Sequence, residues 1–433
     1  MRVLLTNNTL AARAGSELYV RDVALALLAR GHQPIAYSRR LGEVAEELRS
    51  ATVPVVDDLD RLAQPPDLIH AQHHLEAMTA LARFPGIPAI YVCHGWRSPE
   101  EAPPFHPRIR RYVAVDELVR SRLLDECGLP AGQVVTILNF VDLERFRPRP
   151  PLPERPRRAL ALSNRVSEDT YLPALRAACA AAGMSLDAVG LAAGQVWAKP
   201  EDRLGEFDVV FAKGRAALEA AAVGTAVVLC DADGLGPLVN QAELAHLRSL
   251  NFGLRLLRDP VTSDGVRRRL ERYDPADAAG VALRLRAEAG LHPAIDRLLS
   301  LYERVLAEHG AAPGSIAEEM GALARYLRHG PLSGGDFFQS ERERLLAEAV
   351  EARSGARVAA ARLRAAEEGR MQLAAVLEDR TQLTAALEER EALRRELAWI
   401  TGTTTWRLRR RLVGHRWLLA AYLWLASRWR GTS

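Results

Sequence analysis

Residues 211–237 read FAKGRAALEAAAVGTAVVLCDADGLGP, and this stretch decides the fold class. Residues 208–211 are mostly apolar and predict a short strand, which the turn at residues 213–215 ends. Residues 216–223 are mainly helix-forming alanines, and residues 226–229 predict a second, buried strand. A strand, a helix and a strand in this order are typical of an α/β domain with a parallel sheet.

The carboxyl ends of these two strands are the predicted ligand site. In an open α/β sheet, ligands bind beside the strand ends, where helix N-termini attract anions. Lys213 lies in the turn before the helix, and Glu219 lies within the helix. The residues after the second strand predict a loop whose backbone N–H groups face a ligand, at Gly234, Leu235 and Gly236. A lysine, an acid and such a loop suit a ligand that carries phosphates and hydroxyls.

The same stretch resembles the donor-site segment of GT-B glycosyltransferases of family 4, the group 1 transferases. In that family a helix glutamate holds the ribose of a nucleotide-sugar, and Glu219 occupies its position here. The family usually has a second acid eight residues earlier, where this chain has Phe211. The resemblance therefore implies a nucleotide-sugar site, while the alternative for Glu219 is a solvated helix acid.

Three further residues take their expected roles from this resemblance. Residues 14–17 are similar to the family's Gly-Gly-x-Glu turn, which implies that the backbone at Gly15 approaches the donor phosphates. Arg165 matches the family's arginine on the donor diphosphate. The family's following lysine is missing, and Lys213 is the candidate to supply its charge. The alternative for Gly15 is a plain helix-entry glycine.

His94 is the candidate catalytic residue. It follows a predicted apolar strand at residues 89–93 and precedes a glycine, so its ring can reach the crevice. Histidine changes charge near neutral pH and can act on an acceptor hydroxyl. The resemblance implies a place near the transferred sugar and the acceptor, and the alternative is a structural histidine.

Alternating short strands and helices predict two Rossmann-like, doubly wound domains, as the GT-B resemblance implies, and then an α-helical coiled-coil extension. The sequence Asn-Phe-Val-Asp at residues 139–142 is similar to a family signature at the end of the first domain, and a linker rich in proline and arginine follows. The predicted parts are a first domain on the acceptor side (1–140), a second domain that binds the nucleotide-sugar and returns its last helix to the first (141–310), a helix and linker (311–340), a coiled coil (341–398), and an amphipathic tail rich in arginine and tryptophan (399–433).

Composition and motifs exclude several other classes. The chain has 433 residues, a net charge of +4, and ordinary globular contents of 48% hydrophobic and 26% charged residues. Its four cysteines are far apart and predict a reducing compartment without a disulfide framework. The N-terminus is predicted to be a strand and not a signal peptide, and no apolar run is long enough to suggest a membrane span. The fingerprint G-x-G-x-x-G is absent from the first turn, which argues against a nicotinamide-dependent dehydrogenase.

No metal or cofactor is expected. The histidines at 70, 73 and 74 have neither the helical spacing nor the supporting cysteines of a zinc site. The triplet Asp231-Ala232-Asp233 could hold a divalent cation in another glycosyltransferase fold, but here it follows a buried strand. The nucleotide-sugar would therefore be a substrate and no ion would be required.

The C-terminal part predicts the partners. Residues 341–398 are rich in Ala, Leu, Glu and Arg and predict a coiled coil, which would pair with a second copy or with a partner helix. Residues 406–430 combine arginines with tryptophans, which favours a helix lying on a membrane surface. The alternatives are a helix that packs with a partner helix or coiled coil and a helix that binds nucleic acid. The expected location is cytoplasmic, at the inner face of the membrane.

The sequence thus predicts a retaining glycosyltransferase that moves a sugar from a nucleotide-sugar to a hydroxyl. The membrane-binding tail suggests a lipid-linked or polysaccharide acceptor in surface glycan synthesis. The alternative is an inactive GT-B-like subunit that recruits partners through its coiled coil, which Phe211 and the missing lysine favour.

Overall fold

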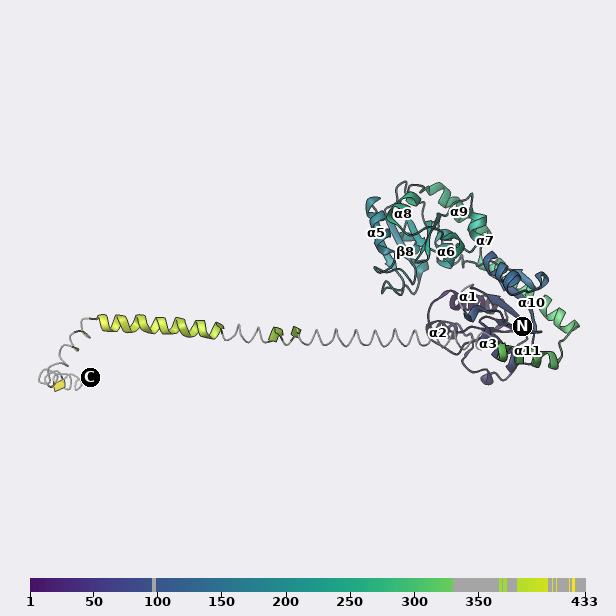
Figure 1. The fold of residues 1–433 in the computed structure, drawn as a ribbon, viewed down its shortest axis with the longest axis horizontal. Coiled ribbons are helices and arrows are strands. Elements are labelled where there is room, and N and C mark those ends of the chain that lie inside the picture. The colour runs from purple at the N-terminus through teal and green to yellow at the C-terminus, as the bar shows by residue number, and fades with distance from the viewer. Residues whose placement is uncertain are drawn as a thin grey trace. The chain divides into compact units, whose positions relative to one another are not determined.

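The computed structural model describes residues 1–95, 99–329, 366–367, 369–371, 380–403, 407, 410, 420, 423 and 424 (Figure 1). The chain divides into two units, Met1–Gly334 and Gly335–Ser433. The first unit holds two α/β domains, which are here called the first domain (residues 1–140 with two C-terminal helices) and the second domain (residues 141–290).

The first domain is built on a seven-stranded sheet in the order β3-β2-β1-β4-β5-β6-β7, and every neighbouring pair is parallel. Its strands are β1 (Arg2–Thr6), β2 (Gln33–Tyr37), β3 (Val55–Val56), β4 (Leu68–Ala71), β5 (Ala89–Cys93), β6 (Ile109–Ala114) and β7 (Val134–Thr136). The central strands are rich in Val, Ile and Leu and are buried on both faces, as parallel sheets covered by helices require.

Helices connect these strands. They are α1 (Gly15–Ala29), α2 (Glu43–Ser50), α3 (His74–Arg83) and α4 (Glu117–Ser121), and α4 continues into a π-helical turn (Arg122–Glu126). Helix α4 begins at residue 117 because the Asp116 carboxylate accepts a hydrogen bond from the Val119 N–H at 2.7 Å. The opening β1–α1–β2 unit brings the N-terminus of α1 to the carboxyl edge of the sheet.

The second domain has a five-stranded sheet in the order β12-β11-β10-β8-β9. Its strands are β8 (Arg158–Leu162), β9 (Ser185–Val189), β10 (Val209–Ala212), β11 (Ala226–Asp231) and β12 (Gly234–Leu238), and its helices are α5 (Leu172–Ala181), α6 (Gly214–Val223), α7 (Leu244–Ser249), α8 (Ser263–Leu270) and α9 (Pro275–Glu288). Strands β8 to β11 are parallel, and α6 ends at Gly224, whose φ of 101° only glycine adopts readily. Two Rossmann-like domains confirm the predicted fold class.

The loop predicted at Gly234, Leu235 and Gly236 is wrong. These residues are buried in β12, which pairs antiparallel with β11, and the Leu235 N–H donates to the Asp259 carbonyl at 2.7 Å. The glycines serve close packing instead of ligand contact. A Cβ at Gly234 would lie 2.8 Å from the Asp259 carbonyl oxygen and 2.9 Å from that of Leu257.

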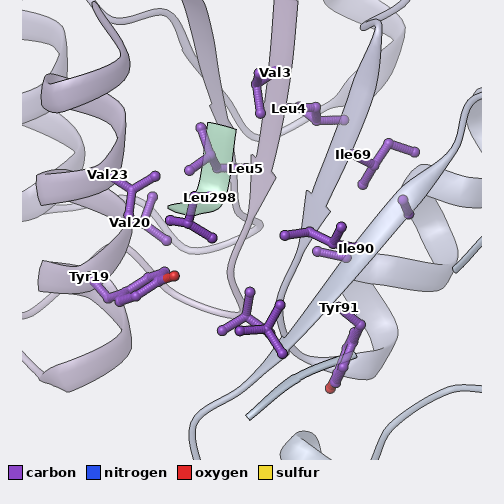
Figure 2. Close-up of a cluster of buried hydrophobic side chains, with 14 of the residues drawn as sticks. Val3, Leu4, Leu5, Tyr19, Val20, Val23, Ile69, Ile90, Tyr91 and Leu298 are labelled. Carbon is purple, nitrogen blue, oxygen red and sulfur yellow. The ribbon is translucent and has the colours of Figure 1, made fainter. Parts of the chain in front are cut away.

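Helix α10 (Leu291–Ala311) leaves the second domain and completes the core of the first. The backbone of Val141 pairs with Gly290, so the chain crosses between the domains twice at one place. Leu298 of α10 then lies in the same buried cluster as residues of α1, β1, β4 and β5 (Figure 2). The two domains are therefore connected by two adjacent chain segments, one at Val141 and one at Gly290.

Helix α11 (Ile316–His329) packs on the first domain through polar contacts. Glu319 of α11 meets the buried Arg108, with 2.9 Å between Arg108 Nε and Glu319 Oε2. The same guanidinium donates to the carbonyls of Leu81, Phe84 and Ile87 at the end of α3. Tyr326 hydrogen-bonds His74 at 2.6 Å. These contacts fix α11 against α3 and the turn before β6, and the helix predicted within residues 311–340 is confirmed.

In the second unit, residues 380–402 form a helix. Its large apolar side chains are exposed, among them Leu383, Leu393 and Leu397. Most of the predicted coiled coil at 341–398 and most of the tail at 406–430 lie outside the described residues. No helix within the described part of the chain is long and apolar enough to cross a membrane.

Candidate functional site

A pocket of about 210 Å³ lies between the two domains, beside the carboxyl ends of their central strands. Residues from α1, from the ends of β8 and β9, and from the start of α6 line it. Its lining residues are Arg13, Ala14, Gly15, Leu18, Arg21, Arg145, Phe146, Leu162, Ser163, Asn164, Val189, Gly190, Val196, Trp197, Pro200, Arg215, Ala216 and Glu219. This is the position where the parallel sheet of an α/β domain offers a ligand site.

Two helix N-termini face the pocket. Gly15 is the first residue of α1, and Arg215 and Ala216 belong to the first turn of α6. Neither N-cap side chain caps its helix, and the Gly214 N–H donates to the Phe252 carbonyl at 2.9 Å. The next N–H groups of α6, at Arg215 and Ala216, and those at the start of α1 therefore remain for an anion. A Cβ at Gly15 would meet nothing within 4 Å. Open space at Gly15 therefore lets a ligand approach the backbone there.

Four of the pocket's residues are arginines, and one is an acid. Arg13 pairs with Glu47, and Arg21 pairs with Asp22 at 2.6 Å. Arg145 pairs with Glu201 at 2.7 Å. None of these carboxylates lines the pocket, so basic side chains outnumber acidic ones among its lining residues.

The fourth arginine, Arg215, joins the domains. Its Nη2 donates to Asp22 of α1, and its Nε donates to the Glu219 carboxylate at 2.7 Å. Burial lowers the pKa of Arg215, but the two carboxylates outweigh burial and raise it overall. Burial raises the pKa of Glu219, and Arg215 opposes that rise. The guanidinium thus favours the ionised form of Glu219.

The opposite wall comes from the second domain. Gly190, at the end of β9, has a φ of 153°, and a Cβ there would lie 1.8 Å from the Ser163 carbonyl oxygen. Only glycine allows this close approach of β9 to β8. Trp197 packs its ring against Phe207 and under the guanidinium of Arg203, 4.3 Å from the ring centre. A fixed aromatic edge therefore closes this side of the pocket.

Of the residues that the sequence proposed for the donor, Gly15 and Glu219 line the pocket. Arg165 and Lys213 do not, because their charges meet the Asp231–Asp233 pair. Lys213 Nζ lies 2.5 Å from Asp231 and 3.1 Å from Asp233, and Arg165 lies 2.5 Å from Asp233. Gly234, Leu235 and Gly236 are paired in β12, as described above.

Phe211, which stands where the family usually has an acid, is fully buried in the core of the second domain. It offers the pocket no polar group.

His94 lies at the end of β5, outside the pocket lining. Its Nε2 lies 2.5 Å from the Gln72 side-chain oxygen, and its ring packs edge-on against Tyr19. Its backbone N–H donates to Glu101 at 2.9 Å. Burial lowers the pKa of His94 to about 4, so it is neutral near pH 7.

Buried histidines give the first domain a predicted pH dependence. Burial lowers the pKa of His70 to about 3 and the pKa values of His94 and His106 to about 4. Between these values and about 6.5 the unfolded chain binds more protons, so stability falls as the pH falls through this range. Thermal unfolding from pH 7.5 to 4.5 should show a falling midpoint.

In the variant His94→Gln, the unfolding free energy should depend less steeply on pH. Its slope against pH should be lower by at most about 1.4 kcal/mol per pH unit. His292→Gln, at an exposed position, is the matched control. An unfolding midpoint that stays constant over this range would contradict the expectation.

Sequence reasoning missed Arg13, Arg21, Arg145 and Arg215. A signal was available for Arg215, which stands four residues before Glu219 and so on the same helix face. For the other three, no local pattern shows that they lie where the two domains meet. Among the described residues, no group of three or more His, Cys, Asp or Glu side chains is placed to hold a metal ion.

Comparisons with known proteins bear on the first domain and on the fold. Residues 13–145 match the model of Glycosyltransferase Family 4. No curated protein sequence gives a significant match.

Among solved structures, Alr3699/HepE from Anabaena in complex with UDP is 14% identical, with a TM-score of 0.51 over 70% of this chain and 100% of its own. A glycosyltransferase from Rickettsia africae is also 14% identical, with a TM-score of 0.51 over 70% and 98%. Sucrose-phosphate synthase from Thermosynechococcus elongatus is 15% identical, with a TM-score of 0.50 over 71% and 99%. These likenesses establish the GT-B fold. The first domain thus carries a match to Glycosyltransferase Family 4, and the two domains together have the GT-B fold of these structures.

Proposed function

We propose that the chain transfers a sugar from a nucleotide-sugar donor to a hydroxyl acceptor, and that the pocket between the domains holds the donor. The observation that carries the proposal is one cationic pocket lined by two helix N-termini, four arginines and Glu219. This set matches the parts of a nucleotide-sugar. Helix N-termini and arginines suit a diphosphate, and a carboxylate suits the ribose hydroxyls.

The arrangement also suits the chemistry of transfer. The bond to the nucleoside diphosphate breaks as the sugar leaves, so negative charge grows on the diphosphate. Fixed arginines and helix N-termini stabilise that charge without reorganising at the moment of reaction. The remaining acceleration comes from holding the donor carbon and the acceptor hydroxyl in line.

Isothermal titration of the full chain with UDP, GDP and their glucose and mannose derivatives tests the proposal. We expect at least one nucleoside diphosphate to bind and its sugar derivative to be turned over in the presence of an acceptor. Folded protein that binds none of these ligands would favour the alternative of an inactive, partner-recruiting subunit.

We further propose retention of the anomeric configuration and a lipid-linked or polysaccharide acceptor. The family resemblance supports the first, and the arginine- and tryptophan-rich sequence at 406–430 supports the second. NMR of the product decides the first, since an inverted anomer excludes retention. Co-sedimentation of the full chain with anionic vesicles tests the tail, and a chain that stays in solution would exclude membrane binding. The exposed leucines at 383, 393 and 397 support pairing of this helix with another, which a monomeric mass in sedimentation would exclude.

A further inference from the structure

We propose that Arg215 binds the phosphate of the donor, held in place by Asp22 of the first domain. The inference rests on the proposed function. It assigns to Arg215 the contact with the donor diphosphate that the sequence analysis expected from Lys213 and Arg165. It also means that both domains contribute to phosphate binding, because Asp22 of the first domain positions Arg215 of the second.

The first argument is position. Arg215 lies in the first turn of α6, lines the pocket and is adjacent to Glu219, while Lys213 and Arg165 are absent from the lining. Lys213 lies 2.5 Å from Asp231, and Arg165 lies 2.5 Å from Asp233. A phosphate in the pocket would meet Arg215 without breaking either of those ion pairs.

The second argument is the geometry of the guanidinium. Its Nε donates to Glu219 and its Nη2 donates to Asp22, and neither acid accepts from Nη1. Arginine presents its donors in a rigid planar fork, so fixing two nitrogens also fixes the third. The side chain is 14% exposed, which leaves it open to the pocket and shielded from bulk water. A charged hydrogen bond is strongest in such a setting.

The third argument is the support behind Arg215. Asp22 is 3% exposed and is contacted by Arg21, Arg145 and Arg215 together. Burial raises the pKa of Asp22, and its arginine neighbours lower it by more, so the carboxylate stays charged. Asp22 therefore fixes the Arg215 guanidinium at the pocket, while Arg21 and Arg145 also pair with Glu47 and Glu201.

The test separates phosphate from nucleoside. Isothermal titration of the full chain with UDP and uridine, and with GDP and guanosine, gives the ratio of diphosphate to nucleoside affinity. For Arg215→Gln we expect this ratio to fall by about 10- to 100-fold, the range for a lost charged hydrogen bond. Nucleoside affinity should change little. Arg215→Lys, which keeps the charge without the fork, should lie between the wild type and Arg215→Gln.

The matched control is Arg267→Gln. Arg267 also pairs with a glutamate four residues later, Glu271, on the exposed face of α8. It should leave both affinities unchanged. Circular dichroism verifies that each variant is folded. If Arg215→Gln does not fold, the affinity ratio is measured with Arg215→Lys instead.

Three results would overturn the inference. Equal losses for diphosphate and nucleoside would make Arg215 a structural residue. A ratio that falls in Lys213→Ala and not in Arg215→Gln would return the role to Lys213. A wild-type chain that binds neither diphosphate would instead remove the proposed function itself, so the two failures are distinguishable.

Discussion

The variant Glu219→Ala is expected to lower the affinity for the nucleotide-sugar by about 10- to 100-fold, and turnover at low donor concentration with it. A carboxylate that accepts hydrogen bonds from ligand hydroxyls contributes roughly 1.5–3 kcal/mol. Glu219 is 7% exposed, and one of its oxygens is held by Arg215 at 2.7 Å. The acid is therefore already oriented before the donor arrives. Titration with UDP and with GDP measures the loss.

Glu219→Gln refines this experiment because it keeps the shape and removes the charge. Its loss should be smaller than that of the alanine variant, since an amide oxygen still accepts one hydrogen bond. Glu271→Gln, at the exposed partner of Arg267, is the matched control. Unchanged affinity in Glu219→Ala would show that the ribose is held elsewhere.

The largest expected effect on stability belongs to Arg108. Its guanidinium is 1% exposed, faces Glu319 and donates to three carbonyls of the α3 end. Arg108→Ala leaves the Glu319 carboxylate buried without its partner, and such losses cost about 3–5 kcal/mol. We expect the first domain to unfold at a clearly lower urea concentration. Hydrogen exchange should increase in α11 and at the end of α3.

Arg111→Ala is the control for this prediction. Arg111 lies on β6, three residues after Arg108, and pairs with Glu308, but its side chain is 20% exposed and that of Glu308 is 41% exposed. A partly exposed pair contributes less than about 1 kcal/mol. The double variant Arg108→Met/Glu319→Met should recover part of the loss, because it removes the unpaired charge. Equal destabilisation by Arg108→Ala and Arg111→Ala would contradict the importance of the buried pair.

Much of the fold could be predicted from the sequence because its strands are short, apolar and bounded by turn residues. Strand β5 has the predicted limits, and α6 begins two residues earlier than predicted. The error at Gly234–Leu238 has a physical cause. Glycines after a strand are typical of a loop, but here they permit tight pairing with the backbone near residue 259, which no local pattern reveals.

The site could be predicted only in part, for the same reason. Glu219 and Gly15 could each be predicted from a short motif at the start of a single helix, and both line the pocket. Arg13 and Arg145 reach the pocket only because the two domains meet there, and the sequence around each gives no sign of that meeting. Lys213 shows the converse. It lies in the turn before α6, as the motif predicts, but its ammonium group pairs with Asp231 and does not line the pocket.

The double crossing at Val141 and Gly290 affects how the protein is made. The core of the first domain includes Leu291, Leu298 and Val305, so it stays incomplete on the ribosome until the second domain has been synthesised. The second domain is one unbroken stretch whose two ends lie side by side. It can fold as soon as it leaves the ribosome, before the first domain, which precedes it in the chain, can complete its core. In evolutionary terms it is an insertion into the first domain, with both ends at a single junction where one such domain could be exchanged for another.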